Sequence, residues 1–289
     1  MTEQISCDVV IPAYNAEDSV VRAIESAIAA GVANVIVVDD GSRDRTAERA
    51  AAAGATCVAQ ENSGAAKARV KGAKLARSKY LIFLDADDEL ISAGTRESVK
   101  VLESDPSLAV AAGTVVGVGR RGMEKRFPVR YSPVTTESLL VQGYGPWPPC
   151  AAVISTAAFR SSHDMKPEKM EPKFAEDYEL LIRLSMVGGI SVRNEPTGRY
   201  SLAGGKSVKS ALSAIRAKEA IRAHYAQHLD IEITSMNERE MEMAARVRIA
   251  RAYWASGYRF RSSKEIAKWA FMDPASAVKK LGTQPWKRN

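Results

Sequence analysis

The sequence has little cysteine and histidine, the residues from which covalent and metal-held scaffolds are built. Its three cysteines, Cys7, Cys57 and Cys150, lie far apart and lack C-x-x-C spacing. Neither a disulfide framework nor a zinc site is therefore expected, and we interpret the cysteines as small buried residues in a reducing compartment. His224 and His228 have the i, i+4 spacing of a metal pair on a helix, but no third ligand is in sight, which favours surface histidines.

No secretory leader is expected, and no unbroken membrane-spanning run is evident in the sequence. Residues 1–8 are polar and acidic, so no signal peptide is expected. The longest uncharged stretch, 138–159, could span a bilayer by length. Glycines and prolines interrupt it, and backbone groups freed in lipid would be costly. We interpret it as buried loop and strand, and we expect a cytoplasmic protein that can associate peripherally with the inner face of the membrane.

What is present is the composition of a soluble globular protein with an uneven charge. Hydrophobic residues make up 46% and charged residues 26% of 289 residues, enough for one large α/β domain with an appendage or for two small domains. From Lys206 to the end there are 17 Lys and Arg against 8 Asp and Glu, whereas residues 1–205 have a net charge of −2. A basic tail indicates an anionic partner, although a solvated helix face explains it equally well.

The first hundred residues alternate between strand and helix patterns. Strands are expected at 8–13, 34–38, 55–59 and 80–84, and helices at 17–30, 44–53 and 65–76. This alternation predicts an α/β fold with βαβ units, a mostly parallel central sheet and helices on both faces. Ligands of such sheets bind beyond the carboxyl ends of the strands.

The later segments predict further strands, loops and helices. Strands are expected at 108–118 and 149–154, the second followed by a short helix. A hairpin or mobile loop is expected at 119–131, a loop at 161–173, and helices at 92–104 and 174–187. Ser92 is the expected N-cap of the first of these helices. The apolar face of the second would contain Leu180, Leu181, Leu184 and Val187. After Ser201 only helices are expected, at 208–228, 235–255 and 262–270, with a domain boundary near Gly204 and Gly205.

Polar residues follow three of the predicted strands, at the point where each strand ends. These residues are at 12–15, 39–42 and 85–88, and they include five carboxylates. Carboxylates gathered at one sheet edge repel one another unless a cation or hydrogen bonds compensate. A hard divalent cation, held by one or two carboxylates and by substrate phosphates, is one solution. Asp85 and Asp87, two residues apart, could address one ligand, although a tight acidic turn without function has the same pattern.

Five segments, in order over about 5–205, carry a resemblance. They are VVIPAYNAED at 9–18, VVDDGSRDRT at 37–46, ENSGAAKARVKGAKLA at 61–76, FLDADD at 83–88 and FAEDYELLIRL at 174–184. Together the chain resembles the family 2 glycosyltransferases of the GT-A fold. The resemblance implies a catalytic domain at 1–205, with a nucleotide-binding half of about 1–105 and an acceptor half of about 106–205. A basic helical C-terminal region would follow at 206–289.

The resemblance implies an inverting, hexosyltransferase-type enzyme that uses a nucleotide-diphosphate sugar, with UDP expected and dTDP or GDP as alternatives. Mn²⁺ or Mg²⁺ would assist. The residues expected to hold the donor are Pro12, Ala13, Tyr14, Asp39, Arg69, Asp85 and Asp87. Within this set, Arg69 would reach the base or the diphosphate and Asp87 would bind the metal. The segment at 199–207 lacks a histidine that could complete the metal site, so metal binding would rest on Asp87, phosphate and water.

On the acceptor side, the resemblance implies that Asp177 is the general base, which takes a proton from the acceptor hydroxyl. At the start of a helix, this carboxylate could instead serve only the helix dipole. Asp88, Glu176, Trp147 and His163 are the expected acceptor or supporting residues. The acceptor would be a saccharide, a lipid-linked molecule or another hydroxyl compound.

Two rival functions remain. A sugar nucleotidyltransferase would need a glycine-rich loop with basic residues after its first strand, and PAYNAED has neither. A non-catalytic nucleotide-sugar or nucleic-acid binding module is the other, but nucleic acid is not expected because no recognition helix or stacking platform is evident. The basic C-terminal helices could instead rest on an anionic membrane surface, through Lys264, Lys268, Lys279, Lys280, Lys287 and Arg288 with Trp269, Phe271 and Trp286.

Overall fold

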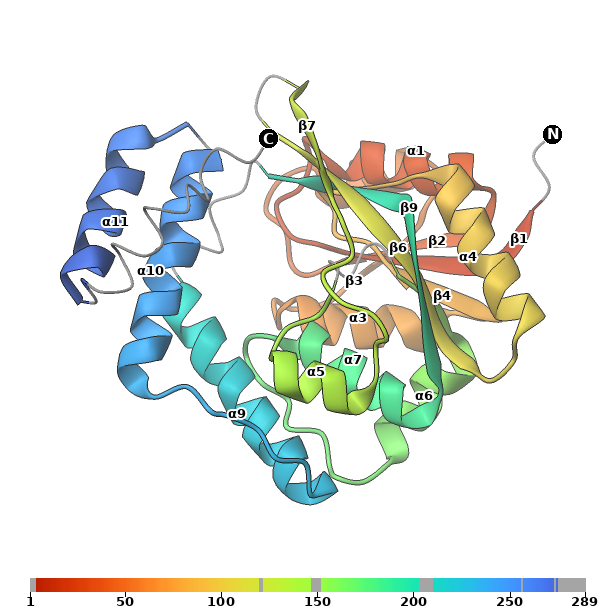
Figure 1. The fold of residues 1–289 in the computed structure, drawn as a ribbon. Helices are drawn as coiled ribbons and strands as arrows, with labels where there is room; N and C mark the ends of the chain where they lie inside the picture. Colours follow the sequence, from red (N-terminus) through yellow and green to blue (C-terminus); the bar gives the residue numbers. More distant parts are fainter. Residues whose placement is uncertain are drawn as a thin grey trace. The chain divides into compact units, whose positions relative to one another are not determined.

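The computed structural model of the protein describes residues 4–119, 122–146, 152–202, 210–255, 257–272 and 274. Within these residues, nine strands form one sheet in the order β3-β2-β1-β4-β8-β6-β9-β5, with β7 paired to β6 (Figure 1). The strands are β1 (Ile5–Ala13), β2 (Val32–Asp39), β3 (Thr56–Ala59), β4 (Tyr80–Phe83), β5 (Glu89–Leu90), β6 (Leu108–Val118), β7 (Glu124–Phe127), β8 (Ala152–Ser155) and β9 (Gly189–Ser201).

Helices cover both faces of this sheet (Figure 1). They are α1 (Val20–Ala30), α2 (Thr46–Ala52), α3 (Ala65–Leu75), α4 (Ser92–Ser104), α5 (Thr136–Gln142), α6 (Thr156–Asp164) and α7 (Glu176–Val187). Helices α1 and α4 lie on one face, and α3, α5, α6 and α7 on the other. Three helices follow the sheet domain: α9 (Ala211–Leu229), α10 (Glu238–Ala255) and α11 (Arg259–Met272).

The first half of the sheet is parallel, as the alternating sequence pattern predicts. Strand β1 pairs in parallel with both β2 and β4, and β2 pairs in parallel with β3. β1, β2 and β4 are mostly buried apolar runs, as expected of parallel strands with helices on both faces, whereas β3 is partly exposed. The other half is mixed, since β8 runs antiparallel to β4 and β6, whereas β6 and β9 are parallel. The predicted hairpin at 119–131 is confirmed by the antiparallel pairing of β6 with β7.

Helix α3 comes close to the sheet at Gly72. A Cβ atom added to this glycine would lie 2.3 Å from Val10 Cγ1 and 3.2 Å from Val38 Cγ2. The first distance is too short for any real contact. Only glycine at position 72 therefore allows α3 to pack this closely against β1 and β2. Because Arg69 lies one turn earlier on α3, the close approach at Gly72 also fixes the level of that side chain above the sheet.

Three local predictions from the sequence are wrong. Ser92 is the first residue of α4 rather than its N-cap, which is Ile91, and no side chain caps this helix. Helix α6 confirms the short helix predicted after 149–154, but it extends into the beginning of the predicted loop at 161–173. Helix α5 occupies the start of the stretch interpreted as loop and strand, where Thr135 and Ser138 form a reciprocal capping box.

The predicted apolar face of α7 is also wrong in part. Leu184 is buried, but Val187 is exposed, and the buried face includes the charged residues Glu179 and Arg183. Arg183 donates to the carbonyl oxygens of residues 162, 165 and 167 at 2.5–2.9 Å. Glu179 accepts from the Met170 N–H at 2.7 Å. These hydrogen bonds hold the segment before α7 and compensate for burying charge.

Strand β9 was not predicted. Its centre contains charged residues and Pro196, and its pairing with β6 shifts register around Thr114. Such an irregularity breaks the period-2 alternation from which a strand is identified. The strand matters because its end, Ser201, lies beside Asp88 of the acidic turn after β4.

The three C-terminal helices form a compact unit of their own, and their type was predicted correctly. The predicted boundary at Gly204 and Gly205 lies outside the described residues. Helices α9 and α10 share a small core around Ala211, Ile215 and Ala245. No helix among the described residues has the length and hydropathy of a membrane span.

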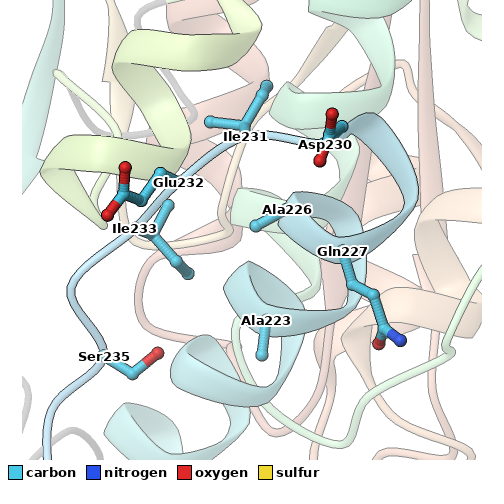
Figure 2. A pocket seen from close by; sticks show the side chains of 8 residues that line it. All are labelled: Ala223, Ala226, Gln227, Asp230, Ile231, Glu232, Ile233 and Ser235. Atoms are coloured by element: carbon cyan, nitrogen blue, oxygen red, sulfur yellow. The ribbon is translucent and has the colours of Figure 1, made fainter.

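A buried ion pair organises the end of α9. Arg222 Nη1 lies 2.7 Å from both carboxylate oxygens of Glu219, which also accepts from the Met236 N–H. The extended segment after α9 leaves a hollow of about 630 Å³ against the helix (Figure 2). Its lining includes Ala223, Ala226, Asp230, Ile231, Glu232 and Ile233. None of the predicted site residues lines this hollow.

Candidate functional site

The carboxyl ends of β1, β2 and β4 bring the predicted donor-binding loops to one sheet edge. Ala13, the last residue of β1, is in register with Asp39, the last residue of β2. Pro12 and Ala13 are buried, so they can offer only backbone groups to a ligand, whereas Tyr14 is exposed. The Asp39 side chain is buried and accepts from the Ser42 N–H at 3.1 Å.

The loops after β1 and β2 are tied to each other. Asn15 donates its N–H to Ser42 Oγ, and its side-chain oxygen accepts from the Arg43 N–H, both at 2.9 Å. Asn15 adopts φ of 48°, in the left-handed region that asparagine tolerates better than most residues. These hydrogen bonds fix the two segments that contain Tyr14 and Asp39 side by side at the sheet edge.

Asp40 has a different role from the other carboxylates at this edge. It accepts from Gln60 Nε2 and from the N–H groups of Ser63 and Gly64, all at 2.8 Å. It is buried, and it anchors the segment that leads into α3. Adjacent side chains of an extended chain point to opposite sides, which is the sequence signal that separates Asp40 from Asp39.

The acidic turn after β4 also divides its carboxylates between two roles. Asp85 and Asp87 have side chains open to solvent, whereas Asp88 is buried. Asp88 Oδ1 accepts from the Ser201 N–H at 2.8 Å, which ties the turn to the end of β9. The five carboxylates are therefore not all available to one ligand, because Asp40 and Asp88 accept hydrogen bonds from neighbouring loops.

Arg69 of α3 joins this acidic turn to the start of α7. Its Nη2 lies 2.7 Å from Asp85 Oδ1, and its Nη1 lies 2.9 Å from Glu176 Oε1. The arginine side chain is only 14% exposed. Burial disfavours its charge, but the negative charges of Asp85, Glu176 and Asp177 outweigh burial and raise the pKa of the guanidinium above its usual value. One cation thus gathers two acidic segments that are far apart in the sequence.

Asp177 lies in the first turn of α7, next to Glu176, with an exposed side chain. One carboxylate oxygen accepts from the Tyr178 N–H at 2.9 Å. Tyr178 is buried and donates its hydroxyl to the Leu139 carbonyl at 2.7 Å, which fixes the beginning of the helix. Ala175, immediately before the helix, has φ of 63°, a costly conformation for alanine that turns the chain into α7.

The donor set at this edge fits a hard divalent cation that is only partly held by protein. No group of three or more His, Cys, Asp or Glu residues suited to a metal exists among the described residues. Asp87 is exposed, and Asp85 is already shared with Arg69. One or two carboxylates together with substrate phosphates and water are the usual ligands of Mg²⁺ in such sites.

The predicted acceptor residues are less well placed. His163 belongs to the last turn of α6 rather than to a loop, where Nδ1 lies 2.9 Å from the Phe159 carbonyl oxygen and the ring packs on Phe159. Trp147 lies outside the described residues. The acceptor side is therefore represented at this edge by Glu176 and Asp177.

Comparison with known proteins covers the donor-side loops, and the matched family region ends before Glu176 and Asp177. The family model described as "Glycosyl transferase family 2" matches residues 8–159. The succinoglycan biosynthesis protein ExoO of Rhizobium meliloti is 32% identical over 181 residues, which cover 59% of this chain and 49% of ExoO. Across the curated relatives, the matched segments span between 25% and 49% of the relatives' own lengths.

Solved structures share the fold. TarS 1–349 of S. aureus, in complex with UDP-GlcNAc, has a TM-score of 0.58 at 19% identity, covering 86% of this chain and 73% of TarS 1–349. Glucosyl-3-phosphoglycerate synthase of Mycobacterium tuberculosis, in complex with Mn²⁺, UDP and glucosyl-3-phosphoglycerate, has a TM-score of 0.52 at 21% identity, covering 78% of this chain and 80% of the synthase. The expected GT-A fold is confirmed. Because the family model matches more than half of its residues, the chain belongs to glycosyl transferase family 2.

Proposed function

We propose that this protein is a glycosyltransferase that moves a sugar from a nucleotide-diphosphate donor to an acceptor hydroxyl with inversion. The observation that carries the proposal is the contact of Arg69 with both Asp85 and Glu176. It brings a donor-side acidic turn and a candidate base within reach of one cation at a sheet edge. This juxtaposition suits a reaction in which a diphosphate leaves while a hydroxyl attacks.

On the donor side, the nucleoside would lie against the loops after β1 and β2. Tyr14 is exposed and can pack on the base, while Asp39 can accept from the base or the ribose. Asp85 would lie near the ribose, and Asp87 would hold a divalent cation, Mn²⁺ or Mg²⁺. When bound, such a cation supplies Lewis-acid neutralisation of the charge that grows on the leaving diphosphate. UDP is the proposed nucleotide, and the relatives with UDP in their structures support it.

On the acceptor side, Asp177 would take the proton of the attacking hydroxyl. A hydroxyl is a weak nucleophile near neutral pH, and a well-placed base contributes roughly 10²–10⁴ in rate. One base, with no second nucleophile assigned, suits direct displacement with inversion. Arg69 would act through Glu176 as a positioning residue, since this ion pair fixes the first turn of α7, which carries Asp177.

The acceptor would be a saccharide, a lipid-linked molecule or another hydroxyl compound, reached from the cytoplasmic side. The similarity to ExoO, a succinoglycan biosynthesis protein, supports a role in polysaccharide or glycoconjugate synthesis.

A thermal-shift panel of UDP, GDP and dTDP, each with and without Mn²⁺, tests the donor site. Ligands stabilise a folded protein by mass action, so the matching nucleotide should raise Tm, and Mn²⁺ should increase the shift. Asp87→Ala should remove only the increase due to Mn²⁺. Glu168→Gln, at an exposed residue, is the matched control and should behave like wild type. If no nucleotide shifts Tm, with or without metal, the donor site is wrong.

A further inference from the structure

Helix α11 exposes an apolar stripe to solvent. Phe260 is 84% and Phe271 is 88% exposed, the highest values among the large hydrophobic residues that the structure describes. Ala267 lies between them and is also exposed. Spacings of seven and four residues place all three on one side of a helix. The two phenylalanines are therefore roughly 16 Å apart along the axis, from about 1.5 Å per residue.

The opposite side of α11 is already occupied. Trp269 and Ser262 are buried, and Ser262 Oγ donates to the Ala250 carbonyl of α10 at 2.8 Å. Glu265 pairs with Arg246 of α10 at 3.2 Å. The two helices pack along this side (Figure 1). Trp269, one of the residues expected to face a membrane, is therefore buried against α10. Phe260 is the aromatic residue that lies on the exposed side.

Cations flank the exposed stripe. Arg259 and Arg261 stand on either side of Phe260, and Lys264 follows one turn later. All three are exposed, and none pairs with a carboxylate among the described residues. From residue 246 to residue 272 the chain has seven Lys and Arg but one acidic residue, Glu265. The surface around Phe260 is therefore positive.

An exposed apolar stripe with cationic flanks is the composition of a helix that lies in a membrane interface. The geometry points to α11 as a docking surface for an anionic lipid bilayer, with Phe260 and Phe271 entering the headgroup region and Arg261 and Lys264 contacting lipid phosphates. A second copy of the chain is the less suitable occupant, because two such surfaces would bring like charges together. This inference does not depend on the transferase activity.

Vesicle flotation of the full chain tests the inference. We expect the protein to float with vesicles of phosphatidylcholine containing phosphatidylglycerol at low salt, and not with phosphatidylcholine alone. High salt should release it, because the cationic contribution is screened. Phe260→Ser combined with Phe271→Ser should weaken binding at least tenfold, since each aromatic ring buries a large apolar area. Lys264→Gln should weaken it about fivefold.

Met123→Ser is the matched control, because Met123 is 74% exposed and lies in the β6–β7 hairpin. It should float like wild type. Circular dichroism should show unchanged folding of the phenylalanine variant, since both side chains are exposed. Three results would overturn the inference: no flotation of the wild type at low salt, equal loss with Met123→Ser, or a dimer that the phenylalanine variant dissociates without any lipid binding.

Discussion

Arg69 Nη1 lies 2.9 Å from Glu176 Oε1, and the two residues are 107 positions apart in the sequence. The same guanidinium reaches Asp85, so helix α3 connects the end of β4 with the start of α7. We propose that Arg69 is a positioning residue, whose loss should lower the rate of the step assigned to Asp177.

Glu176→Gln should slow the reaction without loosening the donor. Glutamine can still accept a hydrogen bond from Arg69, but the ion pair is gone and the first turn of α7 is held less firmly. A misplaced catalytic group costs roughly 10- to 100-fold in turnover. We therefore expect kcat, measured as release of nucleoside diphosphate from labelled donor, to fall by about tenfold while the donor KM stays near wild type.

The control is Glu168→Gln, in an exposed ion pair with Lys166 close to α7 in the sequence. It should leave both constants unchanged. A Glu176→Gln enzyme with wild-type kcat would show that the contact with Arg69 is only structural.

Arg69→Lys should disturb both acidic segments. A lysine ammonium cannot fork between two carboxylates as a guanidinium does, so Asp85 or Glu176 loses its partner. We expect a loss of roughly 1–2 kcal/mol in the free energy of unfolding, less than for a fully buried pair because both carboxylates are partly exposed. Urea denaturation measures it. Lys74→Gln, on the same helix but exposed, should change stability by less than about 0.5 kcal/mol.

Gly72→Ala should push α3 away from the sheet. The added methyl group would collide with Val10 Cγ1. Overpacking of this kind costs about 1–3 kcal/mol, against which alanine gains up to about 1 kcal/mol of helix propensity. Val10→Ala removes the colliding atoms, so the double variant should be more stable than the sum of the single losses by at least about 0.5 kcal/mol. Strict additivity in urea denaturation would argue against the close approach.

Asp8 should make stability depend on pH. It is fully buried and accepts from Asn34, from the Arg77 N–H and from the N–H and hydroxyl of Ser78, at 2.6–2.9 Å. Burial alone would raise its pKa, but these hydrogen bonds outweigh burial and lower it. Its stabilising contribution is therefore complete above the unfolded pKa of about 3.9 and is lost as the pH falls through the lower folded value.

Asp8→Asn should lower the free energy of unfolding by roughly 2–4 kcal/mol near neutral pH, because the NH₂ group of asparagine would face hydrogen-bond donors that need an acceptor. The difference in the free energy of unfolding between variant and wild type, measured by urea denaturation, should decrease below about pH 4. Asp18→Asn, at an exposed aspartate, should match wild type throughout. A gap that stays constant into acid would contradict the assigned role of the Asp8 carboxylate.

Much of the site follows from sequence because parallel strands deliver their carboxyl ends to one edge. This rule places the segments after Ala13, Asp39 and Phe83 together before any coordinates exist. The acidic pair at the start of α7 was identified only by resemblance. Its contact with Arg69 could not be predicted, since nothing in the local pattern says which of many carboxylates a helix-borne arginine meets.

The errors have physical causes. Asp40 and Asp88 resemble their neighbours Asp39 and Asp87 in sequence, but their partners are backbone groups of distant segments, and one of these belongs to a strand that the alternation rule missed. The buried face of α7 includes Arg183 because three carbonyl groups satisfy its donors. Periodicity records hydrophobicity and does not reveal such compensation.

The role of Asp177 is tested most directly by the rate of transfer in Asp177→Asn at saturating donor, with nucleotide affinity measured on the same preparation. Asparagine keeps the size of the side chain but cannot take a proton. We predict unchanged affinity for the nucleotide and Mn²⁺ and a rate lower by roughly 10²–10⁴. An Asp177→Asn enzyme that turns over like wild type would contradict the assignment of Asp177 as the base.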